Sequence, residues 1–174
     1  NDPSLWICPN GMTWLDWQVE KILAQGRKPW LIIGGNGDEI LFKTKSAHDL
    51  NLIYDTEVPS LWTGLWSAAH GASNAAFVLP IQAPVPEASV WDQLAHQSQI
   101  GQEAWYKEKI ALRPRSNETW GYPLLLNSVA LKAIAKMPTE SLEQIALLFR
   151  PADLEPSSAT SAFSTLRSPS EIQR

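Results

Sequence analysis

The sequence predicts a mixed fold, α+β or α/β, in which about five helices pack around a small sheet that contains a β-hairpin and at least one further strand. Short β-branched runs next to glycine or proline indicate the strands, and apolar residues at helical spacing indicate the helices. The 174 residues, 44% of them apolar, suffice for a packed core. We therefore expect one domain over residues 1–150, with a helix-rich C-terminal half, and a tail over 151–174.

The first predicted element is a helix over residues 14–25. Thr13 is a suitable N-cap, and Asp16 follows three residues later in a close variant of the capping box. Gly26 occupies the position where glycine commonly follows the last turn of a helix.

A β-hairpin is predicted next. Residues 29–33 form a short apolar run that is typical of a strand, and residues 39–43 resume an extended pattern. The segment between them, Gly34-Gly35-Asn36-Gly37-Asp38, consists of residues that accept positive φ and so favour a turn.

The middle of the chain contains a second helix and another strand. Residues 46–55 are ambiguous, although Ser46 is a suitable cap for a short helix. A helix is predicted from Pro59 to about Gly71, and residues 75–80 form an apolar run typical of a buried strand.

The C-terminal half is predicted to be mainly helical. Ser89 caps the longest helical pattern, over residues 90–112, and a polar loop over 113–121 follows. Two more helices are predicted, one from Pro123 to about residue 136 and one over 139–149.

From Pro151 onward the chain is rich in Ser, Pro, Ala, Thr and Glu and has few large apolar residues. Such a segment buries too little apolar surface to offset the entropy lost on ordering. We therefore expect residues 151–174 to form a flexible tail or a linker.

Charge and cysteine content exclude several classes of protein. A net charge of −4 and a pI near 5.4 argue against a general nucleic-acid binder, which usually carries a basic face. The single cysteine, Cys8, excludes an internal disulfide and a cysteine-based zinc site. No apolar run is long enough to span a membrane and no leader segment opens the chain, so a cytoplasmic location is expected.

Nine tryptophans are more than a small core usually holds, so we expect some of them at the surface. Two pairs at helical spacing, Trp14 with Trp17 and Trp62 with Trp66, are candidates for core packing or for binding. If Trp62 and Trp66 are exposed beside Leu61, they would form an anchor that fills a groove on another protein.

The sequence therefore predicts a non-catalytic protein–protein interaction or adaptor domain, which is either a subunit or a fragment of a larger assembly. The tryptophan excess, the low charged fraction of 18% and the lack of a catalytic motif support this hypothesis. We expect another protein as the partner, and neither a cofactor nor a metal ion.

An enzyme is the first alternative. Three polar residues near the predicted strand ends are candidates for catalysis, namely His48, His70 and Ser73, with Asp49 or Asp55 as partners. No Gly-x-Ser-x-Gly elbow is present, so this alternative has no sequence motif behind it.

The glycine-rich segment at residues 34–37 is a weak candidate for phosphate binding. It follows an apolar strand, but it lacks the Gly-Lys-Ser/Thr ending of a P-loop and the three spaced glycines of a dinucleotide loop. Asp38 and Glu39 follow directly and would repel phosphate. We expect a hairpin turn here.

A nucleic-acid-binding accessory protein is the second alternative. Basic and aromatic residues gather between positions 105 and 120. An arginine beside an aromatic ring can stack on the ring and bind a phosphate at the same time. The residues of this patch are Lys107, Lys109, Arg113, Arg115, Trp105 and Trp120. An ordinary basic C-terminal end of a helix would explain the same residues without a ligand.

Overall fold

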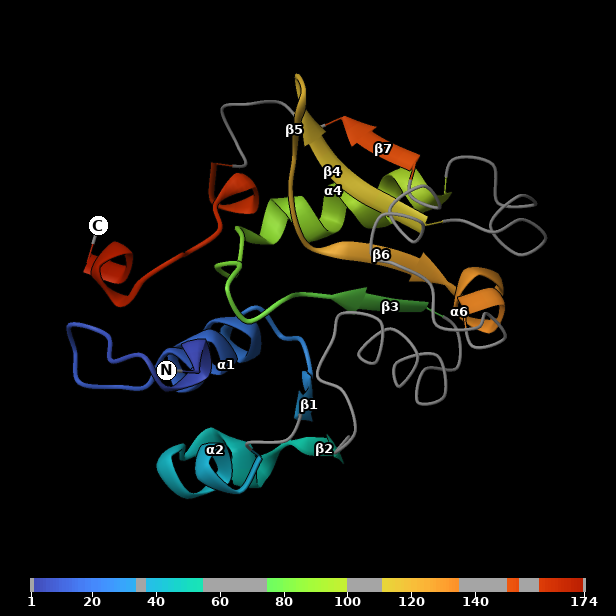
Figure 1. Cartoon of the computed structure of the whole chain (residues 1–174). Coiled ribbons are helices and arrows are strands. Elements are labelled where there is room, and N and C mark those ends of the chain that lie inside the picture. Colours follow the sequence, from blue (N-terminus) through green and yellow to red (C-terminus); the bar gives the residue numbers. More distant parts are fainter. Residues whose placement is uncertain are drawn as a thin grey trace. The chain divides into compact units, whose positions relative to one another are not determined.

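The described residues of the computed structural model are 2–33, 37–54, 75–99, 111–134, 150–153 and 160–173. They belong to two units, which are described separately. Unit 1 comprises Asn1–Pro59, Ile81–Val85 and Thr165–Arg174, and unit 2 comprises Ser60–Pro80 and Pro86–Ser164. Helices and a small sheet occur in both units, so the predicted mixed fold class is confirmed (Figure 1). Four α-helices lie in the described residues, where about five were expected for the chain.

Unit 1 alternates helices with two parallel strands. Its α-helices and strands are α1 (Trp14–Ala24), β1 (Trp30–Ile33), α2 (Gly37–Lys43) and β2 (Asn51–Tyr54). Two short 3-10 helices, η1 (Pro3–Leu5) and η2 (Ser46–Asp49), lie before α1 and before β2. Strands β1 and β2 pair in parallel, with Trp30 opposite Asn51 and Ile33 opposite Tyr54.

Helix α1 confirms the first predicted element. The Thr13 hydroxyl accepts a hydrogen bond from the Asp16 N–H at 3.2 Å, as an N-cap should. Gly26 has φ +72° just after the helix, a conformation that glycine adopts without strain. The local capping residues were therefore enough to place this helix.

The predicted hairpin over residues 29–43 is wrong. Residues Gly37–Lys43 form helix α2, and β1 pairs in parallel with β2 instead. Acidic residues in the first turn suit the N-terminus of a helix, and Lys43 Nζ lies 2.6 Å from Glu39 Oε1, one helical turn away. The segment before α2 thus joins a strand to a helix.

The core of unit 1 has two clusters of buried side chains. Leu15 and Val19 of α1 pack with Ile33 and Ile40. The second cluster joins Trp6, Cys8 and Trp14, and half-buried Trp17, Ile81, Leu166 and Ile172 pack against it. Three separate stretches of the chain therefore build this core.

Unit 2 contains a five-stranded sheet. Its strands are β3 (Ala75–Val78), β4 (Ala111–Ser116), β5 (Thr119–Trp120), β6 (Leu124–Asn127) and β7 (Arg150–Asp153). The order is β3-β6-β4-β5 with antiparallel neighbours, and β7 pairs with β4 in parallel (Figure 1). The predicted strand over 75–80 is confirmed as β3.

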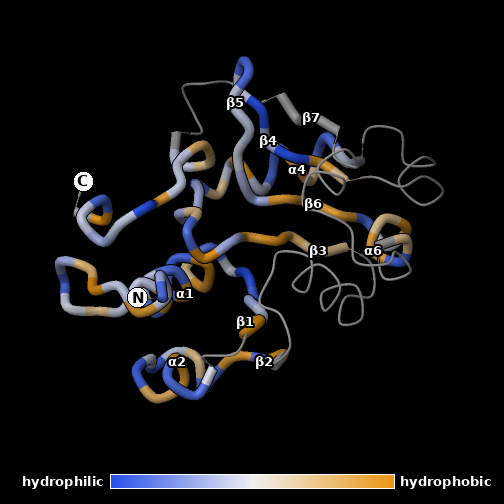
Figure 2. The backbone as a smooth tube through the Cα atoms, in the orientation of Figure 1, coloured by the Kyte–Doolittle hydropathy of each residue, from blue (hydrophilic) through white to orange (hydrophobic). Residues whose placement is uncertain are grey.

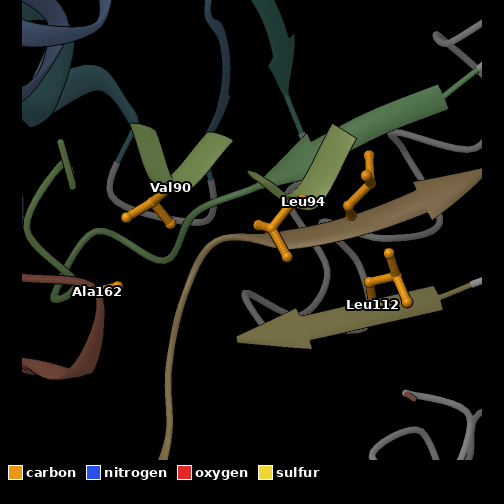
Figure 3. Packing of buried hydrophobic residues seen from close by; sticks show 5 residues of the cluster. Val90, Leu94, Leu112 and Ala162 are labelled. Atoms are coloured by element: carbon orange, nitrogen blue, oxygen red, sulfur yellow. The ribbon is translucent and has the colours of Figure 1, made fainter. Parts of the chain in front are cut away.

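Helix α4 (Ala88–Gln99) covers the core of this sheet. Val90 and Leu94 are fully buried and pack with Leu112, Leu125 and Ala162, where their side chains converge (Figure 3). Helix α6 (Ser128–Ile134) follows β6 directly. The predicted helix over 90–112 is correct only for its first part, because Ala111 and Leu112 belong to strand β4 and residues 100–110 lie outside the described ranges.

One further prediction in this half is wrong and another is correct only in part. The predicted polar loop over 113–121 is the β4–β5 hairpin. The predicted helix from Pro123 to about residue 136 begins as strand β6, and only its later part is helical, as α6. Strand β6 lies between β3 and β4 and every one of its residues is buried, which gives a continuous apolar run without the alternation of a half-exposed strand. The predicted helices from Pro59 and over 139–149 fall outside the described residues.

Residues of the predicted tail contribute to each unit. In unit 2, β7 extends the sheet and Ala162 of η4 (Thr160–Phe163) is 1% exposed. In unit 1, the Leu166 N–H donates to the Gln82 carbonyl at 2.9 Å, just before η5 (Pro169–Gln173). The division into a domain over 1–150 and a tail over 151–174 stays a prediction.

None of the helices in the described part of the chain combines the length and the apolar character needed to cross a membrane.

Candidate functional site

Two arginines and two aromatic rings alternate on the β4–β5 hairpin of unit 2, and we call them the arginine–aromatic cluster: Arg113, Arg115, Trp120 and Tyr122. The Cζ atom of Arg113 lies 5.0 Å from the centre of the Tyr122 ring and 5.7 Å from that of Trp120. The Cζ atom of Arg115 lies 5.9 Å from the Trp120 ring. Each distance is within the range of a cation–π interaction.

The hairpin itself explains this alternation. Residues 113 and 115 are two apart on β4, so they share one face of the strand. Arg115 is directly opposite Trp120 in the antiparallel register, which puts the indole on that same face. The turn between the strands uses Asn117 at φ 53°, a left-handed conformation that Asn tolerates better than most residues.

Hydrogen bonds fix the cluster further. Arg113 Nε donates to the Gly121 carbonyl at 3.1 Å, and the Gly121 N–H donates to the Pro114 carbonyl at 2.8 Å. Both guanidinium groups belong to half-buried residues, whereas Trp120 is 41% exposed. Figure 2 shows that β4 is hydrophilic at this end while the neighbouring β6 is hydrophobic.

The structure places part of the sequence-predicted basic patch in this cluster. Arg113, Arg115 and Trp120 come together, and Tyr122 was missed because a loop and not a hairpin was expected over 113–121. Lys107, Lys109 and Trp105 lie outside the described residues. An anion-binding role for these residues stays a prediction.

A second feature of unit 2 is a shallow, open hollow of about 380 Å³ along α4, lined by Ser89, Asp92, Gln93, His96 and Gln97. Asp92 and His96 are one helical turn apart, so both project from one face of the helix. None of the five was predicted to be a site residue, although their helical spacing was a usable signal.

The edge of the parallel pair in unit 1 is a third candidate. The carboxyl ends of β1 and β2 lie at the same edge, because the two strands are parallel. Ligands of open α/β sheets bind outside the carboxyl ends of the strands, commonly next to a glycine-rich turn that opens a helix. Residues 34–36 lie outside the described ranges, and helix α2 follows them in place of the predicted strand.

The tryptophans proposed as protein-binding anchors are placed as follows. Trp14 is only 3% exposed, and its indole N–H donates to the Ile81 carbonyl at 2.6 Å. Trp17 stacks on it with ring centres 4.9 Å apart and is half-buried. Trp14 is therefore a core residue, while Leu61, Trp62 and Trp66 fall outside the described residues.

The histidine, serine and aspartate residues of the enzyme alternative do not form a described site. His48 and Asp49 are both exposed on η2 of unit 1. Asp55, His70 and Ser73 lie outside the described residues. Within the described ranges, no three His, Cys, Asp or Glu side chains are placed to hold a metal ion.

Two titratable groups of unit 1 have shifted pKa values with a structural cause. Burial raises the pKa of the Cys8 thiol, which suits an unreactive core cysteine. Burial also acts to raise the pKa of Asp16, but hydrogen bonds from Ser46, Thr13 and Lys45 outweigh it and hold the pKa below its usual value. Cys8 and Asp16 therefore have structural roles in unit 1.

Solved structures with the same fold identify the type of architecture. A homologue of Mycobacterium tuberculosis Rv0371c from Mycobacterium sp. strain JC1 is 16% identical, with a TM-score of 0.63 over 89% of this chain and 79% of that one. The 4-diphosphocytidyl-2C-methyl-D-erythritol synthase of Anaerococcus prevotii is 9% identical, with a TM-score of 0.61 over 93% and 83%. Molybdopterin-guanine dinucleotide biosynthesis protein A of Archaeoglobus fulgidus is 16% identical, with a TM-score of 0.61 over 97% and 86%.

The sequence matches no protein-family model and no curated protein. The likeness in structure shows that this chain shares the α/β fold of these proteins. It contradicts our prediction of a non-catalytic interaction module, because the solved structures with this fold include proteins named for synthesis, and it favours the enzyme alternative. The tryptophan excess misled us, since three of the six tryptophans in the described residues are buried in the cores.

Proposed function

We propose that this protein is an enzyme that transfers a nucleotidyl group from a nucleoside triphosphate to an acceptor that carries a phosphate. The likeness in fold over 93–97% of the chain to two proteins with nucleotide-linked products in their names carries the proposal. Their names, diphosphocytidyl and guanine dinucleotide, both describe a nucleoside joined through a diphosphate. The same kind of linkage is the product that we propose here.

The proposed reaction is a substitution at phosphorus. A phosphate oxygen of the acceptor attacks the α-phosphorus of the triphosphate, and a new P–O bond forms. The bond from the α-phosphorus to the bridging oxygen breaks, and its electron pair leaves with pyrophosphate. Such reactions need the protein mainly to position the phosphates and to stabilise their charge.

Two described features support the proposal. The parallel pair β1–β2, in which helix α2 follows β1 along the chain, is the arrangement beside which α/β proteins bind nucleotides. The arginine–aromatic cluster offers groups that bind phosphate and planar rings. Neither feature was recognised from the sequence as part of one enzyme.

Thermal unfolding with nucleotides is the first test. A ligand that binds only the folded state at about 100 times its Kd stabilises it by about 2.7 kcal/mol. For a chain of this size the Tm then rises by several degrees. We expect this with one or two of ATP, CTP, GTP and UTP, and a smaller effect with inorganic triphosphate.

Transfer itself is tested with the preferred triphosphate labelled at its α-phosphate. The protein is incubated with it and with a small-molecule extract rich in phosphate esters. We expect label in a new product that resists alkaline phosphatase, because the labelled phosphate is internal to a diphosphate. Label found only in mono- or diphosphate would indicate hydrolysis, and an unchanged triphosphate together with no Tm shift would overturn the proposal. The cytoplasmic location stays a prediction.

A further inference from the structure

We infer that the arginine–aromatic cluster binds one nucleotide, with Arg113 holding a phosphate and Trp120 stacking on the base. This inference rests on the proposed function and names a place on the molecule for its substrate. Four side chains of unit 2 carry it, and they are held by the backbone of one hairpin.

The arrangement of rings and guanidinium groups leaves N–H donors of Arg113 for a phosphate. The Arg113 Cζ atom lies within cation–π distance of both the Tyr122 and the Trp120 ring, and a guanidinium group directs its N–H donors outward in its own plane. Its Nε–H donates to Gly121, which fixes the plane of the group. The two terminal nitrogens carry the other four of its five N–H donors, in the geometry that binds phosphate oxygens in pairs.

The register of the sheet distinguishes the two arginines. Arg115 is opposite Asp153 on β7, so an acidic residue occupies the neighbouring position. Arg113 is opposite Pro151, which carries no charge. Among the described residues no carboxylate forms an ion pair with Arg113, and we therefore assign the phosphate to Arg113.

The exposed indole accounts for the base. Trp120 is an exposed residue, at 41%, and it lies next to the positive charges of Arg113 and Arg115. Base–aromatic stacking is worth about 1–3 kcal/mol and tolerates any base. One exposed ring beside one phosphate-binding group matches a single nucleotide. A single-stranded nucleic acid would need several rings along a basic groove, and the net charge of −4 disfavours that.

Calorimetric titration with nucleoside monophosphates tests the inference, with the parent nucleosides and inorganic phosphate as separate probes. Arg113→Lys keeps the charge but removes the paired donors, and we expect affinity to fall about tenfold or more. Trp120→Leu removes the stacking ring, and we expect a fall of about fivefold to a hundredfold.

The chain offers a matched control for each variant. Arg167→Lys makes the same change at an exposed arginine of unit 1, and Trp30→Leu removes a tryptophan that is 52% exposed. Neither control should change affinity more than about twofold. Far-UV circular dichroism of all four variants checks that they remain folded.

The outcomes separate this inference from the proposed function. If the wild-type protein forms the labelled transfer product but both cluster variants bind the monophosphate as it does, the inference is wrong and the function stands. If no product forms but binding depends on Arg113 and Trp120, the site stands and the function is wrong. Tighter binding of a short single-stranded oligonucleotide than of any mononucleotide, or no binding of a mononucleotide, overturns the inference.

Discussion

At the scale of single residues, Asp16 shows how one carboxylate joins two elements of unit 1. It is 6% exposed and accepts hydrogen bonds from the Thr13 hydroxyl at 2.8 Å and from the Lys45 N–H at 3.0 Å. Ser46 adds its N–H at 2.8 Å and its hydroxyl at 2.6 Å. The start of α1 is thereby tied to the start of η2.

Replacing this carboxylate should destabilise unit 1. Asp16→Ala leaves a cavity in the place of a buried carboxylate and takes the acceptor from the Lys45 and Ser46 N–H groups, and we expect the free energy of unfolding to fall by about 2–3 kcal/mol. Urea denaturation followed by circular dichroism measures the change. Asp49→Ala, an exposed aspartate on η2, is the control and should stay within about 0.5 kcal/mol of wild type. Equal effects of the two substitutions would contradict the assigned role of Asp16.

The same residue predicts a dependence on pH. The pKa of Asp16 is lower in the folded state than the unfolded value of about 4, so the unfolded chain binds more protons as the pH falls toward and below 4. The stabilisation from Asp16 is complete well above pH 4 and is lost as the pH falls through its folded pKa. Stability measured between about pH 6 and pH 3 should fall less steeply for Asp16→Asn than for wild type. Parallel curves would show that Asp16 does not titrate in this way.

At the scale of elements, capping residues predicted helix ends correctly, whereas short apolar runs did not show whether a segment is a helix or a strand. Thr13, Asp16 and Gly26 define the ends of α1 within a few residues, so its prediction succeeded. The runs at 40–42 and 124–126 are short and apolar, and such runs fit a helix or a buried strand equally well. Only pairing with residues far along the chain decides between them, as β6 does with β3 and β4.

The candidate site was predictable in part for the same reason. Composition alone indicated Arg113, Arg115 and Trp120, because basic and aromatic residues close in sequence favour anion binding. Tyr122 could not be predicted without knowing that the segment is a hairpin. Only the antiparallel register, in which Arg115 is opposite Trp120, brings Tyr122 back to Arg113. The hollow on α4 required knowledge of which face of that helix is buried, namely the face with Val90 and Leu94.

Position 121 requires glycine, because the chain there packs closely against η4. A Cβ at this position would overlap the carbonyl oxygen of Ala162 and would lie 2.8 Å from the Phe163 ring. The Tyr122 N–H donates to that same carbonyl at 2.8 Å, so the backbone has little room to move. We expect Gly121→Ala to destabilise the protein by about 1–3 kcal/mol, measured by thermal unfolding. Asn117→Gly, in the adjacent turn, should be nearly neutral, and a neutral Gly121→Ala would show that η4 packs more loosely.

At the scale of the whole molecule, each unit is assembled from stretches that the other unit interrupts in sequence. Unit 1 uses three stretches and unit 2 uses two. The last stretch of unit 1 contributes Leu166 and Ile172 to the cluster around Trp6, Cys8 and Trp14. A segment that looked like a solvated tail by composition therefore completes a core.

Removing that stretch should weaken unit 1. We expect a chain that ends at Ser164 to lose about 2–4 kcal/mol, since it loses the apolar contacts of two side chains and the hydrogen bond from Leu166 to Gln82. For a protein of this size the Tm would fall by roughly 5–15 °C, which calorimetry measures. A chain that lacks only Arg174 is the control. An unchanged Tm for the chain that ends at Ser164 would show that residues 165–173 are dispensable.

The interleaving of the two units also has a consequence for biosynthesis. A ribosome makes residues 165–173 only after it has made all of unit 2, because unit 2 ends at Ser164. Domains commonly fold as they emerge, beginning with the N-terminal one. Here Leu166 and Ile172, which pack against Trp6, Cys8 and Trp14, are synthesised after unit 2. The core around these three residues can therefore be completed only after translation has passed the whole of the other unit.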